Sequence, residues 1–252
     1  MNPILFKIGS VNVYTHGLFL VLAVVAAGLC LYFLAKHLRV ASSPVLDLII
    51  YPVLFGVIGA RLAYGIVYYS YLSSPLEILK IWEGGLVSWG GFALGLVAYI
   101  VVVKMYKLSI PLWLDMLAIS GMLGVAVGRI GCFVSGELYG VPYTGPGAVR
   151  GIFPVTLVES VLALIVFFIL VLAFVKFHKS RSAKSSFGII FLEGALLYSG
   201  GRFALDFLRS GEKFMRYFNS NQIIELIVFI VAVIVFARLV AGTKKGGPDA
   251  IA

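Results

Sequence analysis

Charged residues are scarce in this sequence. They make up 12% of the 252 residues, whereas soluble domains carry roughly 25%. Hydrophobic residues reach 61%, and no polar stretch is long enough to fold as a separate soluble domain. These proportions exclude an ordinary soluble protein. They predict a single polytopic membrane domain over residues 1–252, built as an all-α bundle.

Other absences narrow the classes further. The two cysteines, Cys30 and Cys132, lie in apolar surroundings and predict no disulfide framework. No group of His, Cys, Asp and Glu has the spacing of metal ligands, and the sequence contains no P-loop, dinucleotide fingerprint or serine hydrolase elbow. We therefore predict neither a metal nor a cofactor. The net charge of +9 comes from short loops, which indicates membrane orientation rather than a nucleic-acid partner.

The sequence does contain a series of long apolar runs. Each has about the 20 residues that a helix needs to cross a bilayer. Together they predict seven transmembrane helices: Leu18–Ala35, Val45–Tyr68, Gly90–Tyr106, Leu112–Phe133, Thr156–Phe174, Phe187–Leu205 and Ile223–Val240. The first run is too long for the core of a cleavable signal and its positive charges follow it, so we expect an uncleaved first helix.

Basic residues between these runs indicate the orientation. Eleven lysines and arginines fall on one side of a seven-helix arrangement and six on the other. Because positive loops stay in the cytoplasm, we predict an outside amino terminus and a cytoplasmic carboxyl terminus in the cell (inner) membrane. Two outer segments are expected to be loops over a site: Tyr69–Trp89, with a short helix over Pro75–Trp82, and the irregular Glu137–Pro154.

Three arginines lie inside predicted helices: Arg61, Arg129 and Arg202. A guanidinium at membrane depth costs on the order of 2.5–3.5 kcal/mol, so a carboxylate or an anionic ligand is expected beside it. Glycines after Arg129 let the backbone approach such a ligand. Carboxylates are predicted in the same outer half of the bilayer, namely Glu137, Glu159 and Asp206. This convergence predicts a buried anion site that opens outward.

Two of these groups have alternative interpretations. Arg202, Asp206 and Arg209 are spaced i, i+4, i+7 and would share one helical face. They form either an ion-paired stripe, or an anion site in which Arg202 binds the ligand and Asp206 orients it. Glu137 is either the structural partner of Arg129, or a general base or orienting group.

The remaining polar positions are also open to two interpretations. Arg61 follows two glycines and either locks two helices together or belongs to the site. Glu159 is a lone carboxylate within a span, where such groups are usually functional or paired. His16 is the one histidine predicted on the outer side, so it is either an interfacial residue or a proton acceptor.

The strongest motif covers residues 128–140, which read GRIGCFVSGELYG. It resembles the signature G-R-x-G-N-F-x-N-G-E-x-x-G of the prolipoprotein diacylglyceryl transferases. Other stretches are similar to that family in the same order: Ile8–Leu18, Gly59–Tyr64, Trp82–Gly91, Phe153–Glu159 and Gly201–Arg209. The resemblance extends over nearly the whole chain.

This resemblance implies an activity and two substrates. Enzymes of the family move the diacylglyceryl group of phosphatidylglycerol onto the lipobox cysteine in the signal peptide of a lipoprotein precursor, and glycerol phosphate leaves. A phosphate leaving group calls for arginines, and a thiol nucleophile needs a base. The implied catalytic residues are Arg129, Arg202, Glu137 and His16. The implied substrate-binding residues are Arg61, Tyr64, Trp89, Cys132, Ser135, Glu159, Asp206 and Arg209.

The chain also departs from the family pattern. Cys132 and Ser135 stand where the signature has asparagines. Trp89 replaces a histidine, and His16 replaces a tyrosine. In the resemblance, Arg129 and Arg202 would bind the head group, oriented by Glu137 and Asp206, with His16 or a carboxylate accepting the thiol proton.

Two other functions remain open at this point. The lost asparagine and histidine positions favour a relative of the same fold that binds or modifies lipid with a different acceptor. A transporter of polar solutes is the second alternative. The sequence has no internal repeat, which transporters commonly have, and its charges gather on one side of the membrane. Both features count against transport.

Overall fold

The computed structural model describes residues 3–8, 11–40, 42–69, 74–80, 85–137, 139–179, 188–210 and 218–245. The chain divides into two compact units, Met1–Leu31 with Leu114–Ala252 and Tyr32–Trp113. Each unit has its own helix packing. The single domain expected from the sequence stays a prediction.

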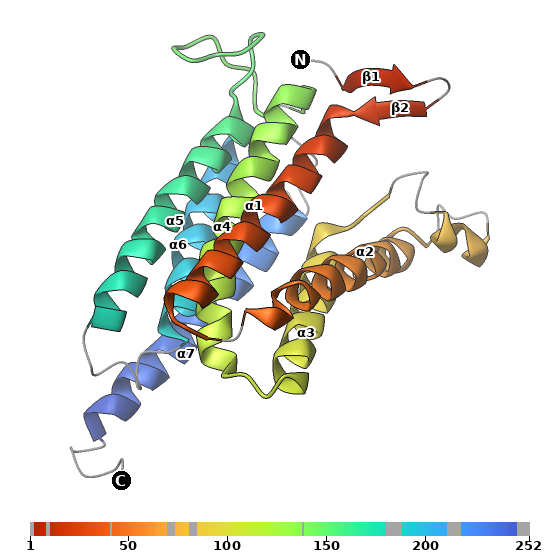
Figure 1. The fold of residues 1–252 in the computed structure, drawn as a ribbon. Coiled ribbons are helices and arrows are strands. Elements are labelled where there is room, and N and C mark those ends of the chain that lie inside the picture. Colours follow the sequence, from red (N-terminus) through yellow and green to blue (C-terminus); the bar gives the residue numbers. More distant parts are fainter. Residues whose placement is uncertain are drawn as a thin grey trace. The chain divides into compact units, whose positions relative to one another are not determined.

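Seven α-helices occur in the described residues: α1 (Thr15–His37), α2 (Asp47–Val67), α3 (Ser88–Met105), α4 (Ile110–Ser135), α5 (Val155–Lys179), α6 (Ile189–Leu205) and α7 (Ser220–Lys245) (Figure 1). Six are long and apolar enough to cross a membrane, and α6 is shorter, at 17 residues. The predicted helical membrane protein is confirmed. In lipid every backbone polar group needs an internal partner, and apolar helices satisfy this requirement.

Small residues let the helices of the first unit approach closely. A Cβ atom added to Gly131 of α4 would lie 2.3 Å from the Cβ of Phe19 on α1. At Gly201 of α6, it would lie 2.8 Å from the side chain of Leu162 on α5. Packing through small residues is typical of membrane helices. It brings α4 against α1 and α6 against α5, and α6 also packs against α7 (Figure 1).

A two-stranded antiparallel sheet precedes α1, and the sequence analysis did not predict it. Strand β1 (Ile4–Ile8) pairs with β2 (Val11–Tyr14) (Figure 1). Leu5 and Phe6 are consecutive apolar residues of β1 and both are exposed, and the strand register is irregular between Ile4 and Phe6. The alternation that usually reveals a half-buried strand is therefore missing. The all-α expectation needs this correction.

The segment after α4 is irregular, as predicted. Residues 136–154 contain no helix where they are described, and isolated bridges join Pro142 to Ile152 and Gly140 to Arg209. Gly140 is needed for this course, since an added Cβ would lie 1.8 Å from the carbonyl oxygen of Phe153. The bridge from Gly140 fixes this segment to the residues that follow α6.

The second unit is built around the pair α2 and α3. Gly59 lies against Gly90, and Gly56 lies against Gly91. The numbering rises along one helix as it falls along the other, so the two helices are antiparallel. A short 3₁₀ helix, Pro75–Leu79, occupies part of the predicted Pro75–Trp82 helix, and residues 81–84 lie outside the described residues.

Replacing Gly59 with alanine is expected to lower the free energy of unfolding by about 1–3 kcal/mol, the usual cost of overpacking. The new Cβ would meet the Gly90 carbonyl oxygen at 2.5 Å and the Leu94 Cβ at 2.6 Å. Gly121→Ala in α4 is the control, because nothing lies within 4 Å of its added Cβ. Denaturation midpoints of the purified variants in detergent measure both. Equal midpoints would contradict the close packing of α2 on α3.

Candidate functional site

A buried carboxylate forms the centre of the polar cluster in the first unit. Glu159 of α5 has a fully buried side chain, and its Oε2 lies 3.0 Å from Nε of Arg129 on α4. Its Oε1 lies 3.8 Å from Nε of Arg202 on α6 and also contacts Nη2 of Arg209. One carboxylate thus connects three guanidinium groups from three segments of the chain.

Two further carboxylates complete the charge balance. Asp206, directly after α6, lies 3.2 Å from Nε of Arg209 through its Oδ1. Glu225 of α7 lies 2.7 Å from Nε of Arg202 through its Oε1. Three carboxylates therefore face three arginines, which is what makes these charges tolerable inside a membrane protein. We call these six residues the arginine–carboxylate network: Arg129, Glu159, Arg202, Asp206, Arg209 and Glu225.

The carboxylates of this network are buried more deeply than its arginines. The side chain of Glu159 has no exposure, whereas those of Arg129 and Arg202 are 22% and 16% exposed. Both arginines meet their carboxylates through Nε, and their Nη groups donate no hydrogen bond to a described residue. The accessible edge of the network is therefore cationic, with Nη donors that can bind an anion in a bidentate manner.

Buried polar atoms without a hydrogen bond gather at the same place. Within the described residues they belong to the network itself, to Thr156 one turn before Glu159, or to Gln222 one turn before Glu225. Such atoms are rare in proteins and each calls for an explanation. Four of them already lie in ion pairs, namely Glu159 Oε2, Arg202 Nε, Asp206 Oδ1 and Arg209 Nε. The others, on Thr156, Gln222, Asp206 and Glu225, are the atoms that a polar ligand could still satisfy.

The pairing within the network differs from the pairing expected from sequence. Arg129 pairs with Glu159 and not with Glu137. Arg202 pairs with Glu225 and Glu159, and the expected orienting role of Asp206 towards Arg202 stays a prediction. Arg209 leaves the predicted helical face because α6 ends at Leu205 and a 3₁₀ turn follows, with extended backbone at Arg209.

A second cluster joins the start of α1 to the end of α4. His16 Nδ1 lies 3.7 Å from Cys132 Sγ and 3.4 Å from Glu137 Oε1. Ser135 Oγ lies 2.9 Å from the Cys132 carbonyl oxygen and 3.3 Å from Glu137 Oε1. We call His16, Cys132 and Glu137 the outer triad. It unites two residues that depart from the family pattern with a glutamate that agrees with it.

Tyr139 links the two clusters, and the sequence analysis missed it. Its hydroxyl lies 3.3 Å from Glu137 Oε2, and the guanidinium carbon of Arg209 lies 5.9 Å from its ring centroid. Burial and the Glu137 carboxylate raise the pKa of Tyr139 above its ordinary value, so the hydroxyl is protonated at neutral pH and donates to Glu137. Its backbone φ of 51° is unusual for a residue other than glycine.

The outer triad also brings together three residue types that can bind a metal, which the sequence spacing did not predict. One ligand atom from each of the three residues lies within 4.8 Å of the others. Sequence spacing could not reveal this group, because His16 and Cys132 are 116 positions apart. The sequence analysis also missed Glu225, although a carboxylate inside a span is itself a signal of function or pairing.

Arg61 and Tyr64 have structural contacts in the second unit. Arg61 is 4% exposed and donates to the backbone carbonyl oxygens of Glu77, Ile78, Lys80 and Gly85. Its guanidinium carbon lies 5.1 Å from the Tyr64 ring centroid. That ring fills the space beside Gly85, whose φ is +75°. The structure favours the locking interpretation of Arg61, with the correction that it holds a loop rather than a second helix.

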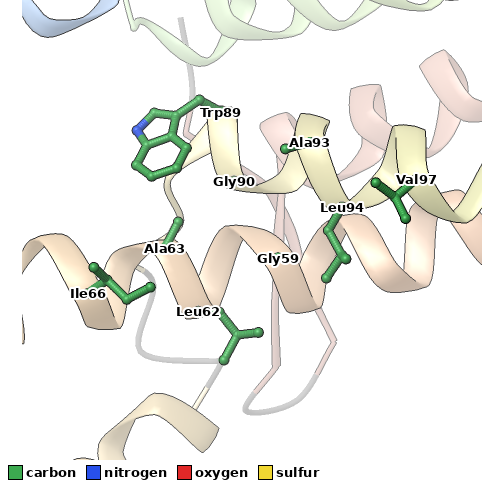
Figure 2. Close-up of a pocket in the computed structure, with 9 residues that line it drawn as sticks. All are labelled: Gly59, Leu62, Ala63, Ile66, Trp89, Gly90, Ala93, Leu94 and Val97. Atoms are coloured by element: carbon green, nitrogen blue, oxygen red, sulfur yellow. The ribbon is translucent and has the colours of Figure 1, made fainter.

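Trp89 lines an open apolar recess between α2 and α3. Figure 2 shows its indole at the start of α3, with Leu62 and Ile66 from α2 and Leu94 and Val97 from α3. No lining residue is charged. The indole N–H is a donor only, so this position supplies no proton acceptor where the family pattern has a histidine. Its role in substrate binding stays a prediction.

The sequence of this chain is similar to those of known proteins. The family model described as prolipoprotein diacylglyceryl transferase matches residues 3–238. This chain belongs to that family. A protein of Geobacter sulfurreducens named phosphatidylglycerol–prolipoprotein diacylglyceryl transferase is 29% identical over 267 residues, covering 98% of each chain. Proteins of the same name from Wolbachia pipientis (28% identical, 94% of each chain) and Acaryochloris marina (31%, 90% of this chain and 86% of the relative) are also similar.

Proposed function

We propose that this member of the prolipoprotein diacylglyceryl transferase family moves the diacylglyceryl group of phosphatidylglycerol to the cysteine thiol of a lipoprotein precursor. Its full-length relatives carry that name. The observation that carries the proposal is the cationic edge of the network, where the partly exposed Arg129 and Arg202 meet the buried Glu159 through Nε. A lipid phosphate is the anion that membrane-embedded helices meet most readily.

The reaction places its largest charge change on this phosphate. Sulfur attacks the glyceryl carbon, a C–S bond forms, and the C–O bond to phosphate breaks with its electron pair leaving on oxygen. The phosphodiester, with one negative charge, becomes a glycerol phosphate that carries more. Arg129 and Arg202 are assigned to this developing charge, because preorganised donors stabilise a transition state most where charge appears. Arg209 is assigned to positioning, because Nε and Nη2 both contact carboxylates.

The outer triad is assigned to the acceptor thiol. His16 would accept the thiol proton, and Glu137, 3.4 Å from its Nδ1, would hold the imidazole in place. Cys132 and Ser135 would line the approach of the precursor. The triad is joined to the network through Tyr139 and Arg209, so phosphate and thiol would be handled by adjoining groups.

We further propose an orientation in the cell (inner) membrane with the amino terminus outside and the carboxyl terminus cytoplasmic. The basic loops between helices support it. The lipobox of the precursor's signal peptide would then approach from the outer face, and phosphatidylglycerol would enter sideways from the bilayer. No nucleic acid takes part in this proposal.

The first test uses purified full-length protein in micelles containing phosphatidylglycerol and a lipobox peptide. Mass spectrometry should detect a peptide heavier by one diacylglyceryl group, and a peptide with serine in place of its cysteine should stay unmodified. Release of glycerol phosphate should match the modified peptide. A folded protein that binds phosphatidylglycerol but leaves the thiol untouched would reject this function in favour of a relative with another acceptor.

A further inference from the structure

We propose that the outer triad is a Zn²⁺ site with an open fourth position that takes a thiol. His16, Cys132 and Glu137 offer one nitrogen, one sulfur and one oxygen ligand. The identity of the fourth ligand rests on the proposed function, because the acceptor thiol is the group to be activated there. The metal site itself rests on the geometry alone.

The separations fit a tetrahedral ion. With Zn–S of about 2.3 Å and Zn–N and Zn–O of about 2.0–2.1 Å, the S···N edge of a tetrahedron is about 3.6 Å and the N···O edge about 3.3 Å. Cys132 Sγ lies 3.7 Å from His16 Nδ1, and that nitrogen lies 3.4 Å from Glu137 Oε1. These two edges match a tetrahedral ion, and the third, from Cys132 Sγ to the Glu137 carboxylate, is at most 4.8 Å.

The donor set selects the metal and the surroundings hold the ligands. Thiolate and imidazole together favour zinc over calcium or magnesium, which prefer oxygen alone. The Glu137 carboxylate is supported by the hydroxyls of Ser135 and Tyr139, each at 3.3 Å, as ligating carboxylates usually are. Cys132 is buried, while the side chains of His16 and Glu137 are 37% and 34% exposed. The open coordination position is therefore reachable.

An open position suits the chemistry of this site. Three protein ligands and one exchangeable position are the pattern of catalytic zinc, whereas structural zinc is closed by four. A thiol that binds zinc loses its proton, here to water, and becomes a thiolate. Its sulfur electron pair can then form the C–S bond while the C–O bond to phosphate breaks. The ion would thus replace His16 as the means of removing the proton.

The test uses the full-length protein in nanodiscs containing phosphatidylglycerol, stripped of metal by a chelator and titrated with Co²⁺. One equivalent of Co²⁺ should give a thiolate-to-cobalt charge-transfer band, and added Zn²⁺ should abolish it. Cys132→Ser should remove the band and weaken binding by more than the roughly 10–100-fold that follows loss of a supporting residue. Cys30→Ser is the matched control, because Cys30 is the other cysteine of the chain, and it should keep the band.

A second arm identifies the fourth ligand. Adding the lipobox peptide to the cobalt-loaded protein should strengthen the charge-transfer band, and its serine counterpart should not. Transfer should fall when metal is removed and return with Zn²⁺. If transfer proceeds at full rate without metal and Co²⁺ gives no band, the triad is only a hydrogen-bonded cluster and the zinc site is rejected, while the transferase function stands. Bound metal without any transfer would reject the transferase function instead.

Discussion

Replacing Arg129 with alanine is expected to lower kcat for diacylglyceryl transfer by about 10²–10³-fold, the usual cost of losing one donor to a developing oxyanion. The Nη groups of Arg129 donate no hydrogen bond to a described residue, and its Nε is held by Glu159 at 3.0 Å. The guanidinium is therefore fixed at one edge and available at the other. Because phosphate gains charge as glycerol phosphate leaves, kcat should fall more than KM rises.

Initial rates of peptide modification over a range of phosphatidylglycerol concentrations measure this effect. Arg129→Lys should recover part of the activity, since lysine restores the positive charge but lacks the planar guanidinium that binds two phosphate oxygens at once. Arg150→Asn is the control, because Arg150 is exposed and its φ of 53° is tolerated by asparagine. An Arg129→Ala protein with unchanged kcat would show that this guanidinium is not at the reacting phosphate.

Replacing Glu159 with glutamine is expected to lower the free energy of unfolding by about 3–5 kcal/mol, the usual result of removing one partner from a buried ion pair. Glu159 has no exposed side-chain area and contacts Arg129, Arg202 and Arg209. The glutamine keeps the size of the side chain and removes only its charge. Asp206 and Glu225 would then face all three arginines, which leaves one buried positive charge unbalanced.

The denaturation midpoint of the purified protein in detergent measures this loss, and a lower yield in the membrane fraction should accompany it. Glu193→Gln on α6 is the matched control, because Glu193 makes no ion pair with a described residue. Its midpoint should stay within about 0.5 kcal/mol of the parent, as for most substitutions outside such networks. A Glu159→Gln protein as stable as this control would contradict a network centred on Glu159.

The membrane-spanning helices could be predicted from composition because a bilayer imposes a simple requirement. A span needs about 20 apolar residues and internal hydrogen bonds for all its backbone groups. Predicted Gly90–Tyr106 corresponds to α3, Ser88–Met105, and predicted Leu112–Phe133 corresponds to α4, Ile110–Ser135. The hairpin of β1 and β2 escaped prediction, since pairing of two short strands leaves little periodic signal when consecutive residues are both apolar.

The residue types of the site were also predictable, while their partners were not. A charge within a span is costly wherever it lies, so Arg129, Arg202 and Glu159 stood out from the sequence alone. Which carboxylate meets which arginine depends on how α4, α5, α6 and α7 pack. Local spacing suggested that Asp206 pairs with Arg202, but Glu225 of α7 lies 2.7 Å from Nε of Arg202 and Asp206 pairs with Arg209.

The sequence by itself determined a membrane protein of apolar helices, a set of buried charges and membership of a transferase family, because each of these depends on residue identity and local order. Only the tertiary structure decided that Glu159 joins three arginines and that His16 meets Cys132 across 116 positions of the chain. Such contacts depend on close helix packing, as at Gly131 against Phe19. Packing of this kind joins residues far apart in sequence, so no local sequence pattern predicts it.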